Sequence, residues 1–308
     1  MIRINSTNEN FSKKLNNPKP DWLKVRMITS DNYLATKRIL EKNNLNTVCV
    51  EARCPNIYEC WDRKTATIMI LGDICTRSCG FCSVKTGKPL SLDNKEPLRT
   101  ANAVKMMRLK HVVITSVDRD DIKEDYGSSI WAKTVEEIHR YVPDCQVEVL
   151  TPDFRGNKKA LLKVFRSNPA IFSHNIECVK RVSREVRPQS DWDRSKNVLS
   201  YAVKNNMVTK TGMMVGLGET DSEVYETLME ISELGVEIFN IGQYLQPTRN
   251  HLPISRYVHP DLFNSYKEFG LRQGFRVIES GPLVRSSYHA DEQVKLYQNK
   301  ENIDKLSD

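Results

Sequence analysis

Alternation between short apolar runs and stretches of helical periodicity constrains the fold of this chain more than any other feature. Six runs rich in apolar and β-branched residues are each followed by a helical pattern, at residues 67–71, 111–115, 146–150, 171–174, 211–215 and 237–241. This alternation predicts an α/β fold of βα units around a parallel sheet. Six such units fit an incomplete (β/α)6 barrel, but spacing alone does not separate that barrel from an open, doubly wound sheet.

The helix predicted after the fifth run has clear signals at both ends. Thr220 and Glu223 have the spacing of a capping box at its start. Apolar residues then recur on one face over 224–234, and Gly235 follows at the place of a C-terminal cap. The pattern therefore predicts a helix that begins after Thr220 and ends before Gly235.

The chain divides into three predicted parts. Residues 1–65 precede the first strand and form an N-terminal extension with one helix near 32–42, residues 66–250 form the partial barrel, and residues 251–308 form a C-terminal segment with a frayed polar tail from 292. The extension begins with a basic arm, since residues 1–30 hold six Lys or Arg and two acidic residues. This arm either attracts an acidic partner or remains a solvated tail.

Length and composition predict one large core and no membrane segment. The chain has 308 residues, of which 39% are hydrophobic, which is enough to bury a sizeable core. No apolar run approaches the roughly 20 residues of a membrane span, and the N-terminus lacks the apolar segment of a secretory signal. We therefore expect a cytoplasmic protein that does not bind membranes.

The cysteines are concentrated in a short part of the chain. Six of the eight lie between residues 49 and 82. In a long chain without a secretory signal, such a cluster indicates metal binding or reactivity rather than disulfides. The cysteines form two groups of three with different spacing, and each group leads to its own prediction.

Cys75, Cys79 and Cys82 form a C-x3-C-x2-C pattern that follows the first predicted strand. Three thiolates on one loop can hold three irons of a [4Fe–4S] cluster and leave the fourth iron open. This spacing is the signature of radical S-adenosylmethionine (SAM) enzymes, in which SAM binds the open iron and yields a radical that removes hydrogen from unactivated C–H bonds. The cofactor carries that chemistry, while the protein orients the reactants and excludes water. A structural zinc loop, which often uses C-x2-C, is the alternative.

Cys49, Cys54 and Cys60 form a second group of three, with C-x4-C-x5-C spacing. A closed zinc site requires four ligands, so two incomplete groups favour two clusters, each completed by another group. Cys145 precedes a strand, at the end away from the expected active face, and Cys178 begins a helical pattern. We expect both to be packed or idle thiols rather than ligands.

Polar and glycine residues follow the strands at places where α/β proteins bind ligands. Asp118 follows the second predicted strand and Asn175 the fourth, and we predict that they contact SAM or substrate. Gly216, Gly218 and Glu219 follow the fifth strand, where the glycines would let the backbone approach SAM closely. A plain strand-to-helix turn explains these glycines about as well.

Several segments together resemble the lipoyl synthase family. The resemblance is carried by residues 49–61, 75–84, 115–121, 209–219, 242–258 and 285–291, and extends from about residue 19 to residue 291. It implies an incomplete (β/α)6 radical-SAM barrel with an N-terminal cluster-binding extension and a C-terminal cap segment. The chain departs from the family pattern at Val50, at Cys178 and in residues 123–126, none of which is a predicted cluster ligand.

The resemblance also implies a second cluster and its fourth ligand. That auxiliary [4Fe–4S] cluster would be held by the second cysteine trio and by Ser287, in the Arg-Ser-Ser-Tyr stretch at 285–288. A serine oxygen is a poor partner for iron–sulfur chemistry compared with a thiolate, which makes sense if that iron must leave. Because Ser287 lies more than 220 residues beyond Cys60, we expect the C-terminal segment to fold back across the barrel mouth. Arg285 either binds substrate or pairs with a carboxylate.

The function implied by the resemblance is the insertion of two sulfur atoms, at C6 and C8, into an octanoyl chain on a lysine of a lipoyl-carrier protein. The cofactors would be SAM and two [4Fe–4S] clusters, with the auxiliary cluster as the sulfur donor. The carrier would be the E2 component of a 2-oxoacid dehydrogenase or the glycine cleavage H protein. A ferredoxin or flavodoxin would supply electrons, and an iron–sulfur carrier would repair the consumed cluster.

Two other functions remain open from the sequence. One is a radical-SAM sulfur-inserting enzyme of the biotin synthase kind, against which the second cysteine trio and the Arg-Ser-Ser-Tyr stretch both argue. The other is a zinc-binding nucleic-acid module. Zinc pairs normally come as two C-x2-C units, and no interleaving of aromatic and basic residues marks a surface for bases, so we expect no nucleic-acid partner.

Overall fold

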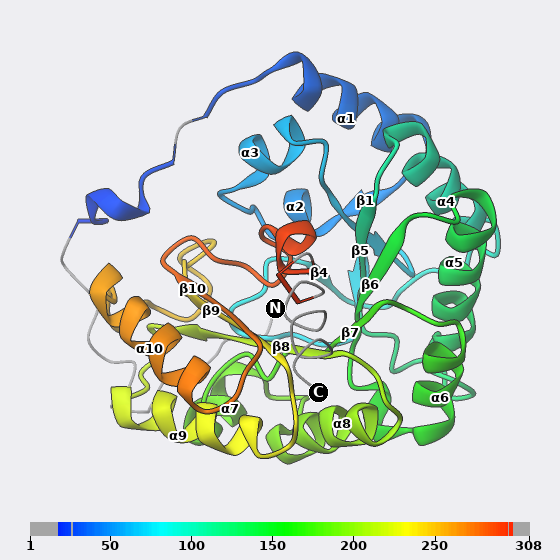
Figure 1. Cartoon of the computed structure of the whole chain (residues 1–308). Helices are drawn as coiled ribbons and strands as arrows, with labels where there is room; N and C mark the ends of the chain where they lie inside the picture. Colours follow the sequence, from blue (N-terminus) through cyan, green and yellow to red (C-terminus); the bar gives the residue numbers. More distant parts are fainter. Residues whose placement is uncertain (1–17, 26, 295, 298–308) are drawn as a thin grey trace, which may run out of the picture.

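The computed structural model describes residues 18–25, 27–294, 296 and 297, and its centre is one eight-stranded sheet (Figure 1). The strand order is β1-β2-β5-β6-β7-β8-β9-β10. β1 runs antiparallel to β2, and the other neighbouring pairs are parallel. The bounds are β1 (Asn46–Thr47), β2 (Thr67–Ile70), β5 (His111–Ser116), β6 (Gln146–Leu150), β7 (Ile171–Ser173), β8 (Thr209–Val215), β9 (Ile238–Gln243) and β10 (Val277–Gly281).

The sheet curls as a barrel does but does not close, because β1 and β10 end it without pairing to each other in the described chain. All six predicted strands are confirmed, with ends that shift by one or two residues. The predicted parallel α/β architecture and the incomplete barrel are therefore confirmed. β10 is a seventh parallel strand that the sequence pattern did not predict.

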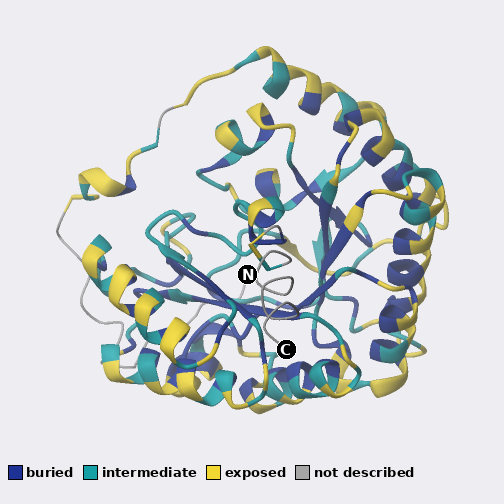
Figure 2. Ribbon diagram, viewed as in Figure 1, coloured by how far each residue is buried: buried dark blue, intermediate teal, exposed yellow. Residues whose placement is uncertain are grey.

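Helices cover the outside of the curled sheet (Figure 2). Their buried faces turn towards the strands and their polar faces towards solvent, which is the arrangement that amphipathic periodicity favours. Within the described ranges, no helix has the length and apolar character required to cross a membrane. The outer helices are α4 (Glu96–Met107), α5 (Ser128–Tyr141), α6 (Lys158–Arg166), α7 (Lys180–Val186), α8 (Trp192–Lys204), α9 (Asp221–Ser232) and α10 (Pro260–Arg272).

The capping box predicted at the start of α9 is confirmed. The Glu223 backbone N–H donates to Thr220 Oγ1 at 3.3 Å, and the Thr220 backbone N–H donates to Glu223 Oε2 at 2.8 Å. Gly235 has a φ of 83°, the left-handed conformation that ends a helix at little steric cost to glycine. Both ends of this helix are therefore fixed by local sequence.

The described part of the N-terminal extension contributes a short 3-10 helix, η2 (Asp21–Leu23), and three α-helices, α1 (Asp31–Lys42), α2 (Val48–Glu51) and α3 (Ile57–Asp62). α1 confirms the helix predicted near 32–42, and Ser30 caps it by accepting from the Tyr33 backbone N–H at 3.1 Å. α1 packs against α3, where the Tyr33 ring lies 5.1 Å from the Trp61 ring. Most of the predicted basic arm lies in residues 1–17, outside the described residues.

The C-terminal segment runs along the open side of the sheet. After β10 it contacts one edge, where Asn56 Nδ2 donates to the Leu283 carbonyl at 2.7 Å and Thr67 Oγ1 donates to Ser287 Oγ at 2.6 Å. On the other edge, Asn240 Nδ2 donates to the Ser286 carbonyl at 3.0 Å. The predicted fold-back is confirmed, since the segment contacts β2 and β9 and Ser286 also contacts Asn175, which follows β7.

The described part of the C-terminal tail is packed where fraying was predicted. Gln293 and Val294 are buried, and Val294 packs against Ile171, Ile238 and Val277 at the beginnings of three strands. The prediction of fraying from residue 292 is therefore wrong for these residues, because Val294 supplies an apolar contact that a polar-looking stretch concealed. Residues 298–308 of the predicted tail lie outside the described residues.

Candidate functional site

A cavity of about 530 Å³ lies inside the curled sheet, and both cysteine trios line it. This volume is within the range of small-molecule sites, roughly 300–1,000 Å³. Apolar side chains from several strands form its wall between the trios, including Met69, Val113, Leu150 and Met213. Of the predicted site residues, the cavity brings together Cys49, Cys54, Cys60, Cys75, Cys79, Cys82, Asp118, Asn175 and Ser287.

The loop of Cys75, Cys79 and Cys82 begins at a small two-stranded ladder, β3 (Ile74–Cys75) with β4 (Lys85–Thr86). Cys75 Sγ accepts from the backbone N–H groups of Arg77 at 3.4 Å and Asp118 at 3.3 Å. Burial and, less strongly, the Asp118 carboxylate raise the pKa of the Cys75 thiol to about 12. Burial likewise raises the pKa of Cys79 and of Cys82. Thiolates in this site therefore need a positive partner, which a metal supplies.

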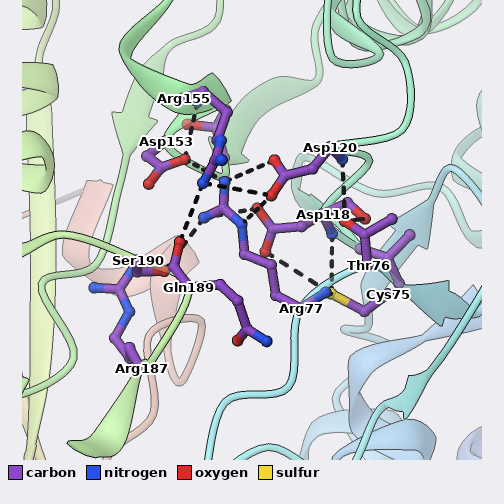
Figure 3. Close-up of polar contacts among 12 residues, drawn as sticks. Cys75, Thr76, Arg77, Asp118, Asp120, Asp153, Arg155, Arg187, Gln189 and Ser190 are labelled. Atoms are coloured by element: carbon purple, nitrogen blue, oxygen red, sulfur yellow. Dashed lines mark hydrogen bonds and ion pairs between the residues drawn. The ribbon is translucent and has the colours of Figure 1, made fainter. Parts of the chain in front are cut away.

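Arg77 anchors this loop from within (Figure 3). Its guanidinium donates to both carboxylate oxygens of Asp120 at 2.8 Å and to Asp153 Oδ1 at 2.7 Å, and it lies 3.2 Å from Asp118 Oδ1. Asp118 and Asp120 follow β5, and Asp153 follows β6. The network therefore ties the loop to the carboxyl ends of two strands. Sequence reasoning missed Arg77, although the acidic run after β5 was a signal that a buried cation faces it.

The second trio lies on the helices of the N-terminal extension and the loop between them. Cys49 is on α2, Cys60 is on α3, and the Cys54 backbone N–H donates to the Cys49 carbonyl at 3.0 Å. Burial raises the pKa of Cys49 to about 11 and that of Cys60 to about 12, and the neighbouring thiols of the trio raise both further. The three sulfur atoms therefore lie close enough to interact electrostatically.

Ser287 and its neighbour Ser286 both lie on the cavity wall with this trio. Ser287 Oγ accepts from Thr67 Oγ1 at 2.6 Å. Ser286 Oγ accepts from Asn175 Nδ2 at 2.6 Å, so the two adjacent hydroxyls have separate partners. The position of Ser287 suits a fourth ligand, and that role remains a prediction.

The donor sets fit iron–sulfur clusters better than a single ion. In the part of the chain that the structure describes, no three His, Cys, Asp or Glu side chains converge closely enough to hold one metal ion. A [4Fe–4S] cluster instead binds each thiolate through a different iron and so holds the sulfur atoms farther apart. This arrangement weighs against the zinc alternative.

Gly216, Gly218 and Glu219 do not belong to the cavity lining. The Glu219 carboxylate is buried and accepts from the backbone N–H groups of Gly216 and Leu217, each at 2.8 Å. Gly216 has a φ of 96°, and a Cβ atom there would overlap Gln243 Nε2. The turn therefore accounts for the glycines, and their contact with SAM remains a prediction without support from the cavity.

Cys145 and Cys178 are buried and outside the cavity lining, as expected of packed thiols. Several charged residues of the lining were not predicted, among them Lys19 and Arg187. Arg187 Nη1 donates to the carbonyls of Asn175 at 3.3 Å and Ile176 at 3.1 Å. Its charge lowers the pKa of Cys79, against the larger effect of burial. No periodicity or spacing in the sequence places these residues beside the cysteines.

Comparisons with known proteins agree with this site. Residues 69–231 match the Radical SAM superfamily. A lipoyl synthase of Rubrobacter xylanophilus is 53% identical over 279 residues, which cover 90% of this chain and 87% of that protein. A mitochondrial lipoyl synthase of Nematostella vectensis is 49% identical over 278 residues, which cover 90% of this chain and 95% of that protein.

Solved structures with the same fold are more distant in sequence. Methylornithine synthase (PylB) matches with a TM-score of 0.52 and 14% identity, over 69% of this chain and 70% of that chain. HydG, a maturase of the [FeFe]-hydrogenase, matches with a TM-score of 0.53 and 13% identity, over 86% of this chain and 67% of that chain. These two structures support the fold alone. The two lipoyl synthases, which are 53% and 49% identical to this chain, show its family. The chain belongs to the lipoyl synthase family of the Radical SAM superfamily.

Proposed function

We propose that this protein is a lipoyl synthase, which inserts sulfur at C6 and C8 of an octanoyl chain attached to a lysine of a lipoyl-carrier protein. The observation that carries the proposal is the single cavity lined by both cysteine trios. An acyl chain in this cavity would lie between the site that generates the radical and the site that supplies sulfur. The apolar wall formed by Val113, Leu150 and Met213 suits such a chain.

Cys75, Cys79 and Cys82 would hold the SAM-binding cluster, and Cys49, Cys54, Cys60 and Ser287 the auxiliary cluster. When bound, SAM and its cluster supply the radical that removes hydrogen, and the auxiliary cluster supplies the sulfur. The contribution of the protein itself is to position these groups. Arg77 holds the first cysteine loop against the ends of β5 and β6, and the C-terminal segment closes the open side of the sheet. This enclosure excludes water from a reactive radical.

Ser287 is proposed as the ligand that can be displaced from the auxiliary cluster. An alkoxide oxygen binds the iron of a sulfide-rich cluster less firmly than a thiolate does. The Thr67 hydroxyl at 2.6 Å gives the free Ser287 oxygen another partner. Release of the serine would therefore not leave the Ser287 oxygen without a hydrogen-bond partner.

The partners follow from the proposed reaction. The carrier would be the E2 component of a 2-oxoacid dehydrogenase or the glycine cleavage H protein. A ferredoxin or flavodoxin would deliver electrons, and an iron–sulfur carrier would rebuild the auxiliary cluster after it gives up its sulfide.

The test is conversion of an octanoyl-lysine peptide by the reconstituted protein under anaerobic conditions with SAM and dithionite. Mass spectrometry should detect the lipoyl peptide, with a yield that stops near one lipoyl group per protein when no cluster source is added. A biotin synthase-like enzyme would instead convert dethiobiotin. Product from dethiobiotin and none from the octanoyl peptide would reject the proposal.

A further inference from the structure

A buried ion pair lies inside the curled sheet. The side chains of Lys210 on β8 and Glu148 on β6 are 1% and 0% exposed, and Lys210 Nζ lies 3.0 Å from Glu148 Oε1 and 3.2 Å from Glu148 Oε2. His111 on β5 joins them, since its Nε2 atom lies 3.8 Å from Glu148 Oε2. Three polar side chains from three different strands therefore meet in the interior, and we call them the floor group.

The ion pair lies next to the cavity, on the side of the strand beginnings. Successive residues of a strand point to opposite faces of the sheet, so residues two apart point the same way. Leu150 and Gly212 line the cavity, and Glu148 and Lys210 are the residues two positions earlier on the same strands. Val113, which also lines the cavity, pairs in register with Glu148. The two charged side chains therefore fill the interior where the cavity ends on β6 and β8.

The cavity extends further towards the strand beginnings on β2 and β5. Its lining reaches Thr67 and His111, which are the first residues of these strands. Thr67 donates to Ser287, the proposed fourth ligand of the auxiliary cluster, and pairs in register with Val113, two residues after His111. The deepest part of the cavity therefore ends at His111, close to the place proposed for the sulfur source.

The floor group cannot easily make room for the end of an apolar chain. Each charge of a buried ion pair depends on the other, because neither is hydrated, so moving one aside is costly. Among the residues that the structure describes, His111 Nε2 is buried without a hydrogen-bond partner, and an alkyl group pressed against it could not supply one. Beyond the floor group the strand beginnings are closed by a cluster of apolar side chains, Ile171, Ile238, Val277 and Val294.

We propose that the floor group is the stop against which the end of the acyl chain rests, and that it sets the length of chain that the protein accepts. The inference rests on the proposed function, since it takes an octanoyl chain as the occupant. Ligands of parallel α/β folds enter at the carboxyl ends of the strands. A chain that enters there and stops at His111 has its last carbons, C6 to C8, beside Thr67 and Ser287. A longer chain would hold C6 and C8 nearer the mouth, away from the proposed sulfur source.

The test measures the affinity of fluorescent peptides that carry a hexanoyl-, octanoyl- or decanoyl-lysine. They are titrated with the anaerobically reconstituted protein and SAM, without reductant, and followed by fluorescence anisotropy. The variant Glu148→Ala/Lys210→Met removes both charges together, so that neither is left unpaired, and opens space at the floor. The matched control is Lys180→Met/Asp193→Ala, because this Lys–Asp pair is exposed and its partners lie 2.8 Å apart.

Wild type should bind the decanoyl peptide more weakly than the octanoyl peptide by roughly tenfold or more, because two further methylene groups would press against buried charges. In the floor variant this difference should shrink to about twofold, and the control variant should keep the difference seen in wild type. Equal affinity of wild type for the two peptides would overturn the proposal. So would a folded floor variant that keeps the preference of wild type.

A second variant decides the matter if the double substitution prevents folding, which far-UV circular dichroism would reveal. His111→Ala leaves the ion pair intact and removes only the side chain that faces the cavity, so it should also improve binding of the decanoyl peptide relative to the octanoyl peptide. An unchanged preference in His111→Ala would then overturn the proposal. If wild type converts the octanoyl peptide after dithionite is added but no variant changes the preference, the stop alone is wrong. If wild type neither binds nor converts the octanoyl peptide, the proposed function fails with it.

Discussion

The Arg77 guanidinium lies 2.7 Å from the Asp153 carboxylate, and both side chains are almost fully buried. Arg77 belongs to the loop of the first cysteine trio, and Asp153 follows β6. Asp153 also accepts from Arg194 Nε at 2.7 Å, which links this pair to α8. One buried ionic network therefore determines where the first cluster loop lies relative to the sheet.

Replacement of Arg77 should destabilise the protein strongly. Arg77→Gln leaves buried carboxylates without their counter-charge, which should lower the free energy of unfolding by about 3–5 kcal/mol. Arg181→Gln is the control, because Arg181 pairs with Glu223 near the surface and an exposed pair contributes at most about 1 kcal/mol. Urea unfolding of the metal-free proteins measures both, and equal losses would contradict the role of the network.

The contribution of Asp153 should depend on pH with a defined sign. Its hydrogen bond and ion pair with Arg77 hold the pKa of Asp153 well below its usual range, despite an opposing effect of burial. A carboxyl with a lowered folded pKa stabilises fully above its unfolded pKa of about 3.9 and loses that contribution as pH falls further. The difference in unfolding free energy between wild type and Asp153→Asn should therefore be constant from about pH 5 to 7 and shrink below about pH 4. A difference that grows on acidification would contradict this assignment.

Substitutions in the two cysteine trios should have different effects on SAM cleavage. Changing Cys75, Cys79 and Cys82 to Ala should leave about half of the iron and abolish SAM cleavage, because each trio holds one [4Fe–4S] cluster. Changing Cys49, Cys54 and Cys60 should also leave about half of the iron but preserve SAM cleavage. Iron analysis and detection of 5′-deoxyadenosine decide the matter. Complete loss of iron in both, or cleavage that follows the other trio, would refute the assignment.

Ser287 and Ser286 should differ sharply on substitution. Ser287→Cys should retain the auxiliary cluster at least as firmly as wild type, cleave SAM, and make little lipoyl product, because a thiolate releases iron less readily than an oxygen ligand. Ser286→Ala removes one hydrogen bond to Asn175 and should cost only about 0.5–1.5 kcal/mol in stability. Product analysis by mass spectrometry compares them, and a larger loss of product at Ser286 than at Ser287 would reverse the assignment.

Gly242 should be required for the position of the C-terminal segment. A methyl group at Gly242 would overlap the Val284 carbonyl, so Gly242→Ala should displace residues 284–287, destabilise the protein by about 1–3 kcal/mol and weaken iron binding at the second trio. Gly87→Ala is the matched control, since its added Cβ would lie 3.5 Å from Ile74 Cγ2 in ordinary contact. Thermal unfolding and iron content should separate the two variants. Similar behaviour would show that the close approach at Gly242 is not required.

The parts of the structure that could be predicted are those that depend on residues close together in the sequence. The six apolar runs became strands because each is long enough to pair and is bounded by turn residues, and Thr220 with Glu223 capped α9 as expected. β10 was missed because it is short and its last three residues, from Glu279 to Gly281, are half-buried and not strongly apolar. Both cysteine trios were also visible, since their spacing alone indicates the donor sets.

The electrostatic parts of the site were not predictable because they depend on residues far apart in the chain. Arg77 meets Asp153 only after β5 and β6 pair in register. Lys19 and Arg285 come from opposite ends of the described chain, and both line one cavity. The assignment of Ser287 came from family resemblance, because a serine in a C-terminal loop has no chemical signal of its own. The glycines at 216 and 218 suggested a contact with SAM. In the structure, the hydrogen bonds and close packing of the local turn account for them.

The course of the C-terminal segment has a consequence for how the protein is made. Residues 283–287 complete a wall that begins with Asn56 and Thr67, so one side of the second trio stays exposed until residue 287 has been made. Nascent chains fold from the N-terminus, and the first cysteine loop can reach its partners at the ends of β5 and β6 long before that point. A nascent chain can thus shape the first site before residue 283 is made but cannot complete the second, and truncation before residue 283 would leave the second trio without part of its wall.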